Sequence, residues 1–217
     1  MTLEGTEGSG KTTQGQALAD TLGEHTPVLL TREPGGTELG DRVRDLLLDV
    51  GGSRLDPVAQ LLLLSAARAQ HVREKLLPAL RNNVTVICVR YADSSRAYQG
   101  GGDQLSHETV ETAIELATEG LEPDLTLYLD LDPKEGLARR SQDRVDGVTG
   151  TQEGWNSFDD RELAFHQRVR AAYLEIARHN PERVVTVDAA RPFDEVRAEI
   201  LRIVQGRLAA HHIGGSF

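Results

Sequence analysis

The feature that most constrains this chain is an eight-residue pattern close to its start. It reads Gly5-Thr6-Glu7-Gly8-Ser9-Gly10-Lys11-Thr12, which has the form G-x-x-x-x-G-K-[ST] of a loop that wraps phosphate groups. The glycines let successive backbone N–H groups turn toward phosphate oxygens, and a helix after the loop directs its positive end at the same anion. Residues 2–4 can end a strand before the loop, and residues 13–22 fit a helix after it. The pattern predicts nucleotide binding, against the alternative of a glycine-rich turn without a ligand.

Further along, short apolar runs alternate with longer helical patterns. The expected strands are residues 28–31, 84–89, 125–131 and 184–188, and the expected helices are residues 37–50, 57–82, 106–120, 133–142, 158–179 and 193–210. Strands that are apolar almost throughout suit a parallel sheet covered on both faces. Asp56-Pro57 and Asp132-Pro133 each place a capping side chain before a proline of the first helical turn. The fold class predicted is α/β: a three-layer α/β/α sandwich with a parallel central sheet, whose ligands bind at the carboxyl ends of the strands.

We expect a single domain over residues 1–210, followed by a C-terminal tail at 211–217. Residues 147–157 are rich in Gly, Thr and Ser, and the arginines on either side are Arg139, Arg140, Arg144 and Arg161. A segment of this kind, at about residues 139–161, fits a lid that carries arginines over a phosphoryl-transfer site; a solvated surface loop is the alternative. The run of three glycines in residues 99–103 predicts a second loop.

Composition narrows the function classes. A formal net charge of −10 argues against a general nucleic-acid binder, which needs a basic face, but not against a nucleotide substrate. The single cysteine, Cys88, lies in an apolar run, so we expect a core residue and not a nucleophile; the absence of disulfide partners fits a reducing cytoplasm. We find neither a signal peptide nor an apolar stretch of 18 residues, so we expect no membrane partner.

Several side chains follow predicted strands at the edge where ligands bind. Arg32 leaves the second strand, with a surface ion pair to Glu33 as the alternative to substrate binding, and Arg90 directly follows the most apolar strand. Arg68 lies on an otherwise apolar helix, where an arginine must reach solvent or pair with an anion such as a substrate phosphate. The polar group that comes next can recognise a base and a sugar, and consists of Tyr91, Ser94, Ser95, Tyr98 and Gln99.

Taken together, these motifs closely resemble bacterial thymidylate kinases, of the P-loop nucleoside monophosphate kinase family. The matching segments are residues 4–14, 31–37, 90–91, 94–95, 97–100 and 123–130, in family order. The resemblance implies a P-loop NTP hydrolase-like fold and transfer of the γ-phosphoryl group of ATP to dTMP, which gives dTDP and ADP for dTTP synthesis. It also implies Mg²⁺ as cofactor and a homodimer.

The resemblance further implies roles for individual residues. Residues 5–12 and Thr13 hold the ATP phosphates, Thr12 ligates Mg²⁺, and the catalytic residues are Lys11, Arg90 and Arg144, the last with Arg139 or Arg140. Glu7 meets the 3′-hydroxyl of the deoxyribose, and Arg32, Arg68 and Arg90 lie near the dTMP phosphate. The thymidine pocket takes Leu64, Ser95, Tyr98 and Gln99. The loop of residues 188–192 is where related kinases contact adenine.

The chain departs from the family pattern at four places. Val89 stands where the family has an Asp that helps organise Mg²⁺ and the catalytic arginine, and Leu64 stands where a Phe stacks on thymine. The lid is longer than usual, so that Asp143-Arg144 and Asp160-Arg161 compete for its role, and the first strand is short, which leaves a truncated start as an option. These departures keep two alternatives open: a catalytically impaired nucleotide-binding homologue, and a kinase for another nucleoside monophosphate.

Overall fold

The five strands form one parallel sheet. The computed structural model describes residues 1–48, 55–145, 158 and 161–213. The strands are β1 (Thr2–Gly5), β2 (Val28–Arg32), β3 (Thr85–Val89), β4 (Thr126–Asp130) and β5 (Val184–Asp188), in the order β2-β3-β1-β4-β5. Every neighbouring pair is parallel, so the predicted parallel sheet is confirmed. The order reverses beside β1, which places the loop after β1 at the point where such sheets bind ligands.

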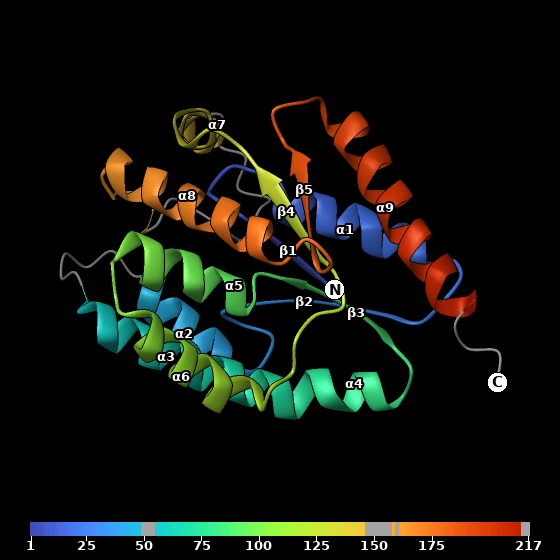
Figure 1. The fold of residues 1–217 in the computed structure, drawn as a ribbon, viewed down its shortest axis with the longest axis horizontal. Helices are drawn as coiled ribbons and strands as arrows, with labels where there is room; N and C mark the ends of the chain where they lie inside the picture. The colour runs from blue at the N-terminus through green and yellow to red at the C-terminus, as the bar shows by residue number, and fades with distance from the viewer. Residues whose placement is uncertain (49–54, 146–157, 159–160, 214–217) are drawn as a thin grey trace.

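Helices cover both faces of the sheet (Figure 1). The helical elements are α1 (Lys11–Gly23), α2 (Glu38–Leu48), α3 (Pro57–His71), η1 (Val72–Leu76), α4 (Leu77–Arg81), α5 (Ala92–Ser95), η2 (Arg96–Gly102), α6 (His107–Thr118), α7 (Pro133–Val145), α8 (Leu163–His179) and α9 (Phe193–Ile213). The two predicted caps are confirmed, because Asp56 accepts from the N–H groups of Val58 and Ala59, and Asp132 from that of Lys134. No described helix has the length and apolar character needed to span a membrane.

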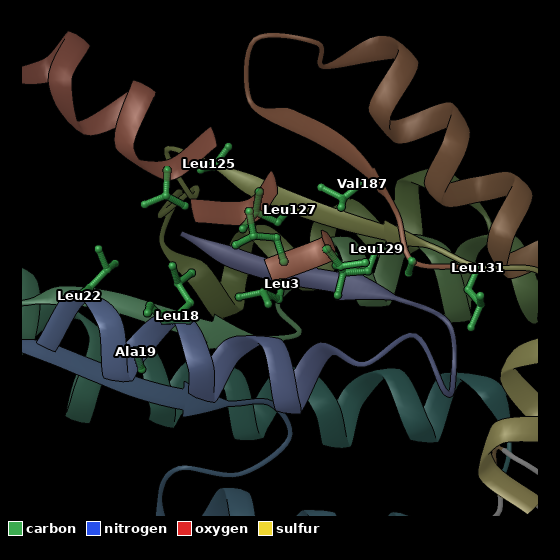
Figure 2. Close-up of a cluster of buried hydrophobic side chains, with 14 residues drawn as sticks. Leu3, Leu18, Ala19, Leu22, Leu125, Leu127, Leu129, Leu131 and Val187 are labelled. Carbon is green, nitrogen blue, oxygen red and sulfur yellow. The ribbon is translucent and has the colours of Figure 1, made fainter. Parts of the chain in front are cut away.

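The core on one face of the sheet lies between the strands and the helices α1 and α9. Figure 2 shows Leu3, Leu127 and Leu129 of the central strands beside Leu18 and Leu22 of α1. Alternate residues of a strand point to opposite faces, so Tyr128 joins a different cluster, with Phe165 and Tyr173 of α8 and others. This double burial explains why the strands read as continuous apolar runs.

The prediction of a loop at residues 99–103 is wrong for most of that segment. Residues 96–102 form the π-helical element η2, which continues α5. A Cβ atom built on Gly101 would lie 2.5 Å from the Cβ of Ala172, and one on Gly102 would lie 2.4 Å from the ring of Phe165. The glycines therefore permit close contact between η2 and α8, and do not break the helix.

Several helices also differ in detail from the expectation: α7 and α9 run past their expected ends at residues 142 and 210, to Val145 and Ile213. The predicted helix 57–82 is continuous to Arg81, but a π-helical stretch, η1, interrupts its hydrogen-bond pattern at residues 72–76. The predicted helix 158–179 begins at Leu163. Residues 211–213 of the expected tail belong to α9. Residues 214–217 and most of the expected lid, residues 146–157 and 159–160, lie outside the described residues.

Candidate active site

The phosphate-binding loop joins β1 to α1 with the backbone that the motif requires. Gly8 and Gly10 have φ angles of +69° and +83°, a region that residues with a Cβ atom rarely adopt. Lys11 is buried, and its ammonium donates to the carbonyl of Thr6 at 2.6 Å and to the hydroxyl of Ser9 at 3.2 Å. The loop is thus closed around its own lysine, which stands at the first turn of a helix, where anions are stabilised.

A second part of the site centres on the carboxylate of Glu7. Arg90 donates to one oxygen of Glu7 at 2.9 Å, and the hydroxyl of Tyr98 donates to the other at 2.5 Å. Burial alone would raise the pKa of Glu7, but the charges of Arg90 and Lys11 and the Tyr98 hydrogen bond hold the pKa below its usual value. The group is therefore an ionised carboxylate in a positively charged setting. His166 of α8 is also close, with Nδ1 at 3.7 Å from Glu7.

Arg68 is held inside the protein by an anion of the protein itself. Its guanidinium donates to Glu33 at 2.7 Å, to the hydroxyl of Ser95 at 3.0 Å and to the carbonyl of Tyr91 at 2.9 Å. The other oxygen of Glu33 lies 2.9 Å from Nδ1 of His71. Glu33 is buried and engaged in this way, so the alternative of a surface ion pair between Arg32 and Glu33 is wrong. A guanidinium has five N–H groups, which leaves two of Arg68 beyond the three bonds named.

One cavity connects these parts. Its walls include nine of the predicted site residues, namely Glu7, Gly8, Lys11, Leu64, Arg68, Arg90, Ser95, Tyr98 and Gln99. They also include Ser94 and Arg140, two further candidates from the sequence, and the residues that the sequence did not suggest for the site, namely Glu33, Pro34, Arg44, Leu48 and Phe158. Gln99 is buried, and both polar atoms of its amide lack a hydrogen-bond partner within the part of the chain that the structure describes. Such a group is suited to a ligand, because an unsatisfied buried amide is costly.

The other predicted residues take different places. Arg32 ends β2 and does not belong to the cavity walls, and neither do Gly5, Thr6, Ser9, Gly10, Thr12 and Thr13, which form the loop and the start of α1. Arg144 lies in α7 near its end, but its side chain is outside the described residues.

The arginines that flank the expected lid differ in their partners. Arg139 donates to Glu135 and to the carbonyl of Ala189, and Arg161 is paired with Asp103 at 2.6 Å. Arg140, in contrast, lines the cavity together with Lys11. The burial of Arg161 disfavours the Asp160-Arg161 pair as the source of a catalytic arginine.

Val89 occupies the position where the family resemblance implies an Asp, and Glu4 and Asp93 are two acidic residues near it. Val89 is buried, and its Cγ2 lies 3.1 Å from the position of a Cβ on Gly15 of α1. The carboxylate of Glu4 accepts from the N–H of Tyr91 at 2.7 Å, from Ser94 at 2.6 Å and from Tyr173 at 2.9 Å. Burial, reinforced by the nearby charge of Asp93, raises the pKa of Glu4 to about 7.

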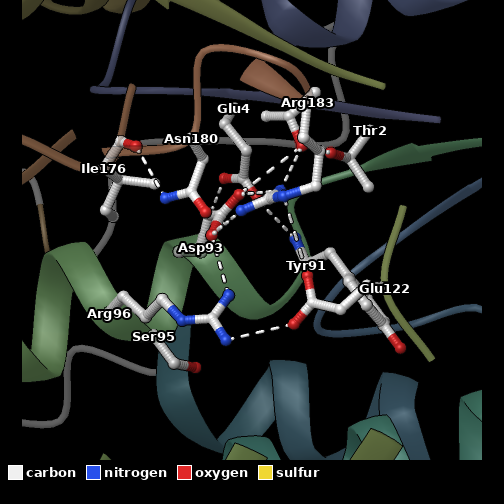
Figure 3. A network of polar contacts seen from close by, with 12 residues as sticks. Thr2, Glu4, Tyr91, Asp93, Ser95, Arg96, Glu122, Ile176, Asn180 and Arg183 are labelled. Atoms are coloured by element: carbon white, nitrogen blue, oxygen red, sulfur yellow. Dashed lines mark hydrogen bonds and ion pairs between the residues drawn. The ribbon is translucent and has the colours of Figure 1, made fainter. Parts of the chain in front are cut away.

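Asp93 belongs to a network of ion pairs with two arginines (Figure 3). It is paired with Arg96 at 2.9 Å and with Arg183 at 2.7 Å. Burial opposes its charge, but these two arginines hold the pKa of Asp93 below its usual value. Among the carboxylates of Glu4, Glu7 and Asp93, only that of Glu7 lies in the cavity wall.

One group of described residues has the spacing of a metal site. Ligand atoms of Glu33, His71 and Cys88 lie within 4.8 Å of one another, and all three residues are buried. The oxygens of Glu33 already bind Arg68 and His71, and the thiol of Cys88 donates to the carbonyl of Arg90 at 3.0 Å. Burial raises the pKa of Cys88 well above its usual value, which disfavours the thiolate that a metal needs. The cluster is a buried polar network, and Cys88 is the core residue predicted.

Sequence reasoning missed the partners that hold the site in place. The sequence suggests Glu33 only as a surface partner of Arg32, although its position after β2, before Pro34, places it at the ligand edge of the sheet. His71, His166 and Tyr173 lie on helices far along the chain, and no local pattern marks them. Their part depends on how α3 and α8 pack.

The chain is similar to known proteins over nearly its whole length. The family model described as thymidylate kinase matches residues 3–200. A curated thymidylate kinase of Pelobacter propionicus is 42% identical over 210 residues, which is 96% of this chain and 94% of that protein. One of Desulfosudis oleivorans is 44% identical over 206 residues, with 94% and 95% covered. The crystal structure of thymidylate kinase from Ehrlichia chaffeensis superposes with a TM-score of 0.72 at 32% identity, over 94% of this chain and 96% of that one. The chain therefore belongs to the thymidylate kinase family.

Proposed function

We propose that the protein transfers the γ-phosphoryl group of ATP to dTMP. The observation that carries this proposal is the single cavity in which Lys11 of the phosphate-binding loop faces the same space as Arg68, Arg90 and the polar group of Ser95, Tyr98 and Gln99. A phosphoryl donor and a nucleotide acceptor can therefore meet. Phosphoryl transfer requires positioning and charge neutralisation more than covalent chemistry, and these are what the lining residues offer.

On the acceptor side, the cavity offers cations for a phosphate and polar groups for a nucleoside. Arg90 and the remaining N–H groups of Arg68 suit the phosphate of dTMP, because guanidinium groups bind phosphoryl oxygens in a fixed geometry. The amide of Gln99 suits the edge of a base. Glu7, fixed by Arg90 and Tyr98, suits the 3′-hydroxyl of the sugar.

On the donor side, the backbone N–H groups of residues 5–12 and of Thr13 would hold the ATP phosphates. The hydroxyl of Thr12, at the start of α1, is a hard oxygen donor of the kind Mg²⁺ accepts. Bound Mg²⁺ would neutralise charge on the phosphates. Lys11 and Arg90 stabilise charge on the transferring phosphoryl group. A third cation for the same role comes from α7, and it is either Arg140 or Arg144.

We further propose a homodimer. Three neighbouring helices each leave a leucine exposed: Leu46 of α2 at 53%, Leu62 of α3 at 60% and Leu116 of α6 at 74%. Both α2 and α6 pack against α3, so these leucines belong to one layer, where a second copy of the chain can cover them. The net charge of −10 supports a small-molecule substrate and not a nucleic-acid partner. The single cysteine, Cys88, is a buried free thiol, which is compatible with the reducing cytoplasm.

Sedimentation of Leu62→Glu and Leu116→Glu tests the dimer, because a charge in an apolar interface dissociates it. The matched control is Leu174→Glu on α8, which is 42% exposed and lies outside the three helices. A dimeric mass for both test variants would contradict the proposed face.

The function is tested by ADP release from ATP and Mg²⁺ with a panel of nucleoside monophosphates. We expect release that depends on dTMP and on Mg²⁺, and its loss in Lys11→Met. A different preferred monophosphate would reassign the substrate. Binding of dTMP and ATP without turnover would identify a catalytically impaired homologue.

A further inference from the structure

We propose that Phe158 is a specificity-determining residue whose ring packs on the base of the acceptor nucleotide. This inference rests on the proposed function and names the side chain that supplies the aromatic wall of the same cavity. Phe158 lies far along the chain from the other residues that recognise the nucleoside, and no motif in the sequence marks it.

The first support is position. Phe158 lines the cavity together with Leu64 and Gln99. Its ring meets that of Tyr98 edge to face, with centroids 6.0 Å apart and an interplanar angle of 84°. Because Tyr98 is itself fixed through Glu7, this contact holds the Phe158 ring against a rigid part of the site.

As a second support, Arg161, three residues after Phe158, lies over the Phe158 ring and is itself held by buried partners. The guanidinium carbon of Arg161 lies 5.8 Å from the centroid of Phe158 and 4.5 Å from that of Phe165. Arg161 is paired with Asp103 at 2.6 Å and donates to Gln60 at 3.3 Å. The pair is buried, since the two side chains are only 9% and 0% exposed.

Asp103 is in turn fixed by the helix before it. Its N–H donates to the carbonyl of Tyr98 at 2.8 Å, so the end of η2 holds the carboxylate that holds Arg161. Arg161, whose guanidinium lies over the Phe158 ring, is therefore tied to the element that carries Tyr98 and Gln99.

The third support is the chemistry of the cavity. Gln99 brings one donor and one acceptor, both buried and without a partner among the described residues, which suits the polar edge of a base. A base also has two flat faces, and an aromatic ring on such a face is worth more than an aliphatic side chain. Leu64 offers only an apolar surface, so the ring that stacks on the face of the base is that of Phe158.

The test measures binding by calorimetry, with dTMP and with 2-deoxyribose 5-phosphate, which lacks the base. We expect Phe158→Leu to weaken dTMP binding roughly 5- to 150-fold, which is a stacking energy of about 1–3 kcal/mol converted at about 1.4 kcal/mol per factor of ten. Binding of the sugar phosphate and the KM for ATP should not change. Phe193→Leu, which changes an exposed phenylalanine of α9, is the matched control and should bind both ligands as the unaltered protein does.

A rescue sharpens the test. Leu64→Phe in the Phe158→Leu background places a ring on the other apolar wall and should recover most of the lost affinity for dTMP. The inference is overturned if Phe158→Leu binds dTMP normally, or if dTMP and the sugar phosphate weaken equally, which would indicate a structural role. If the unaltered protein fails to bind dTMP, the proposed function fails instead, so the two failures are distinct.

Discussion

The guanidinium of Arg68 meets the carboxylate of Glu33 at 2.7 Å, with only 2% and 5% of the two side chains exposed. The partners come from α3 and from the loop after β2, which are 35 positions apart. Glu33 also binds His71, so one carboxylate orients both the arginine that faces the cavity and a histidine behind it. A substrate-facing charge is thereby fixed before any ligand arrives.

Breaking this pair should be costly. We expect Arg68→Met to lower the free energy of unfolding by about 3–5 kcal/mol, because the Glu33 carboxylate is left buried without its cation. Urea denaturation measures the change. The control is Arg42→Met, whose pair with Glu38 is 75% and 81% exposed and should contribute less than about 1 kcal/mol. Equal losses of unfolding free energy in the two variants would show that the buried pair contributes no more to stability than the exposed one.

The glycines of η2 offer a test of packing. Gly101→Ala and Gly102→Ala should each lower the free energy of unfolding by about 1–3 kcal/mol, because the new methyl group collides with α8. Gly100→Ala is the control: its nearest neighbour would be 3.9 Å away, so it should be neutral or stabilising. Thermal melts of the three variants measure the difference. Similar melting temperatures would mean that η2 and α8 can move apart at little cost.

Glu4 should make stability depend on pH in a defined window. Burial raises its pKa from 4.5 to about 7, so the folded state binds a proton more tightly than the unfolded state. The stabilisation is full below pH 4.5 and is lost as the pH rises toward 7 and above. Its size is roughly 3 kcal/mol, from the shift in pKa.

The comparison that isolates this effect is Glu4→Gln, which keeps the shape but carries no charge. Urea melts from pH 5 to pH 7.5 should show a falling free energy of unfolding in the unaltered protein and a flatter one in the variant. The difference between the two curves cancels the other titrating groups. Parallel curves would show that Glu4 is ionised throughout this range.

Val89→Asp should speed the reaction and weaken the fold. The family resemblance implies a carboxylate directly before Arg90, and one preorganised electrostatic element is worth roughly 10²–10³ in rate. We therefore expect kcat to rise about 100-fold, while burial of the new group lowers the free energy of unfolding by about 1–3 kcal/mol. Both are measured on the same preparation, by ADP release and by urea denaturation.

Val89→Asn is the matched variant, since it has nearly the same size and polarity but no charge. It should lose stability as Val89→Asp does, without the gain in kcat. An equal kcat in all three proteins would mean that the site works without a carboxylate at this position.

Much of the fold was predictable because its signals are local. The parallel sheet followed from short apolar runs, and the caps at Asp56 and Asp132 followed from an acidic residue before a proline. The failure at residues 99–103 is instructive, since three glycines in a row normally favour a loop. Here Gly101 and Gly102 permit close contact with Ala172 and Phe165 of α8, which lie far along the chain from them.

The sequence by itself determined the phosphate-binding loop, the alternation of strands and helices along the chain, and the arginines that follow the strands. Each of these features depends on residues within a few positions of one another. Only the tertiary structure decided which charges pair. Tyr98 and Glu7 are 91 positions apart and Arg161 and Asp103 are 58 apart, and their contact depends on how α8 and η2 pack against the sheet. The physical reason is that a buried charge finds its partner through space, whereas a sequence pattern records only neighbours along the chain.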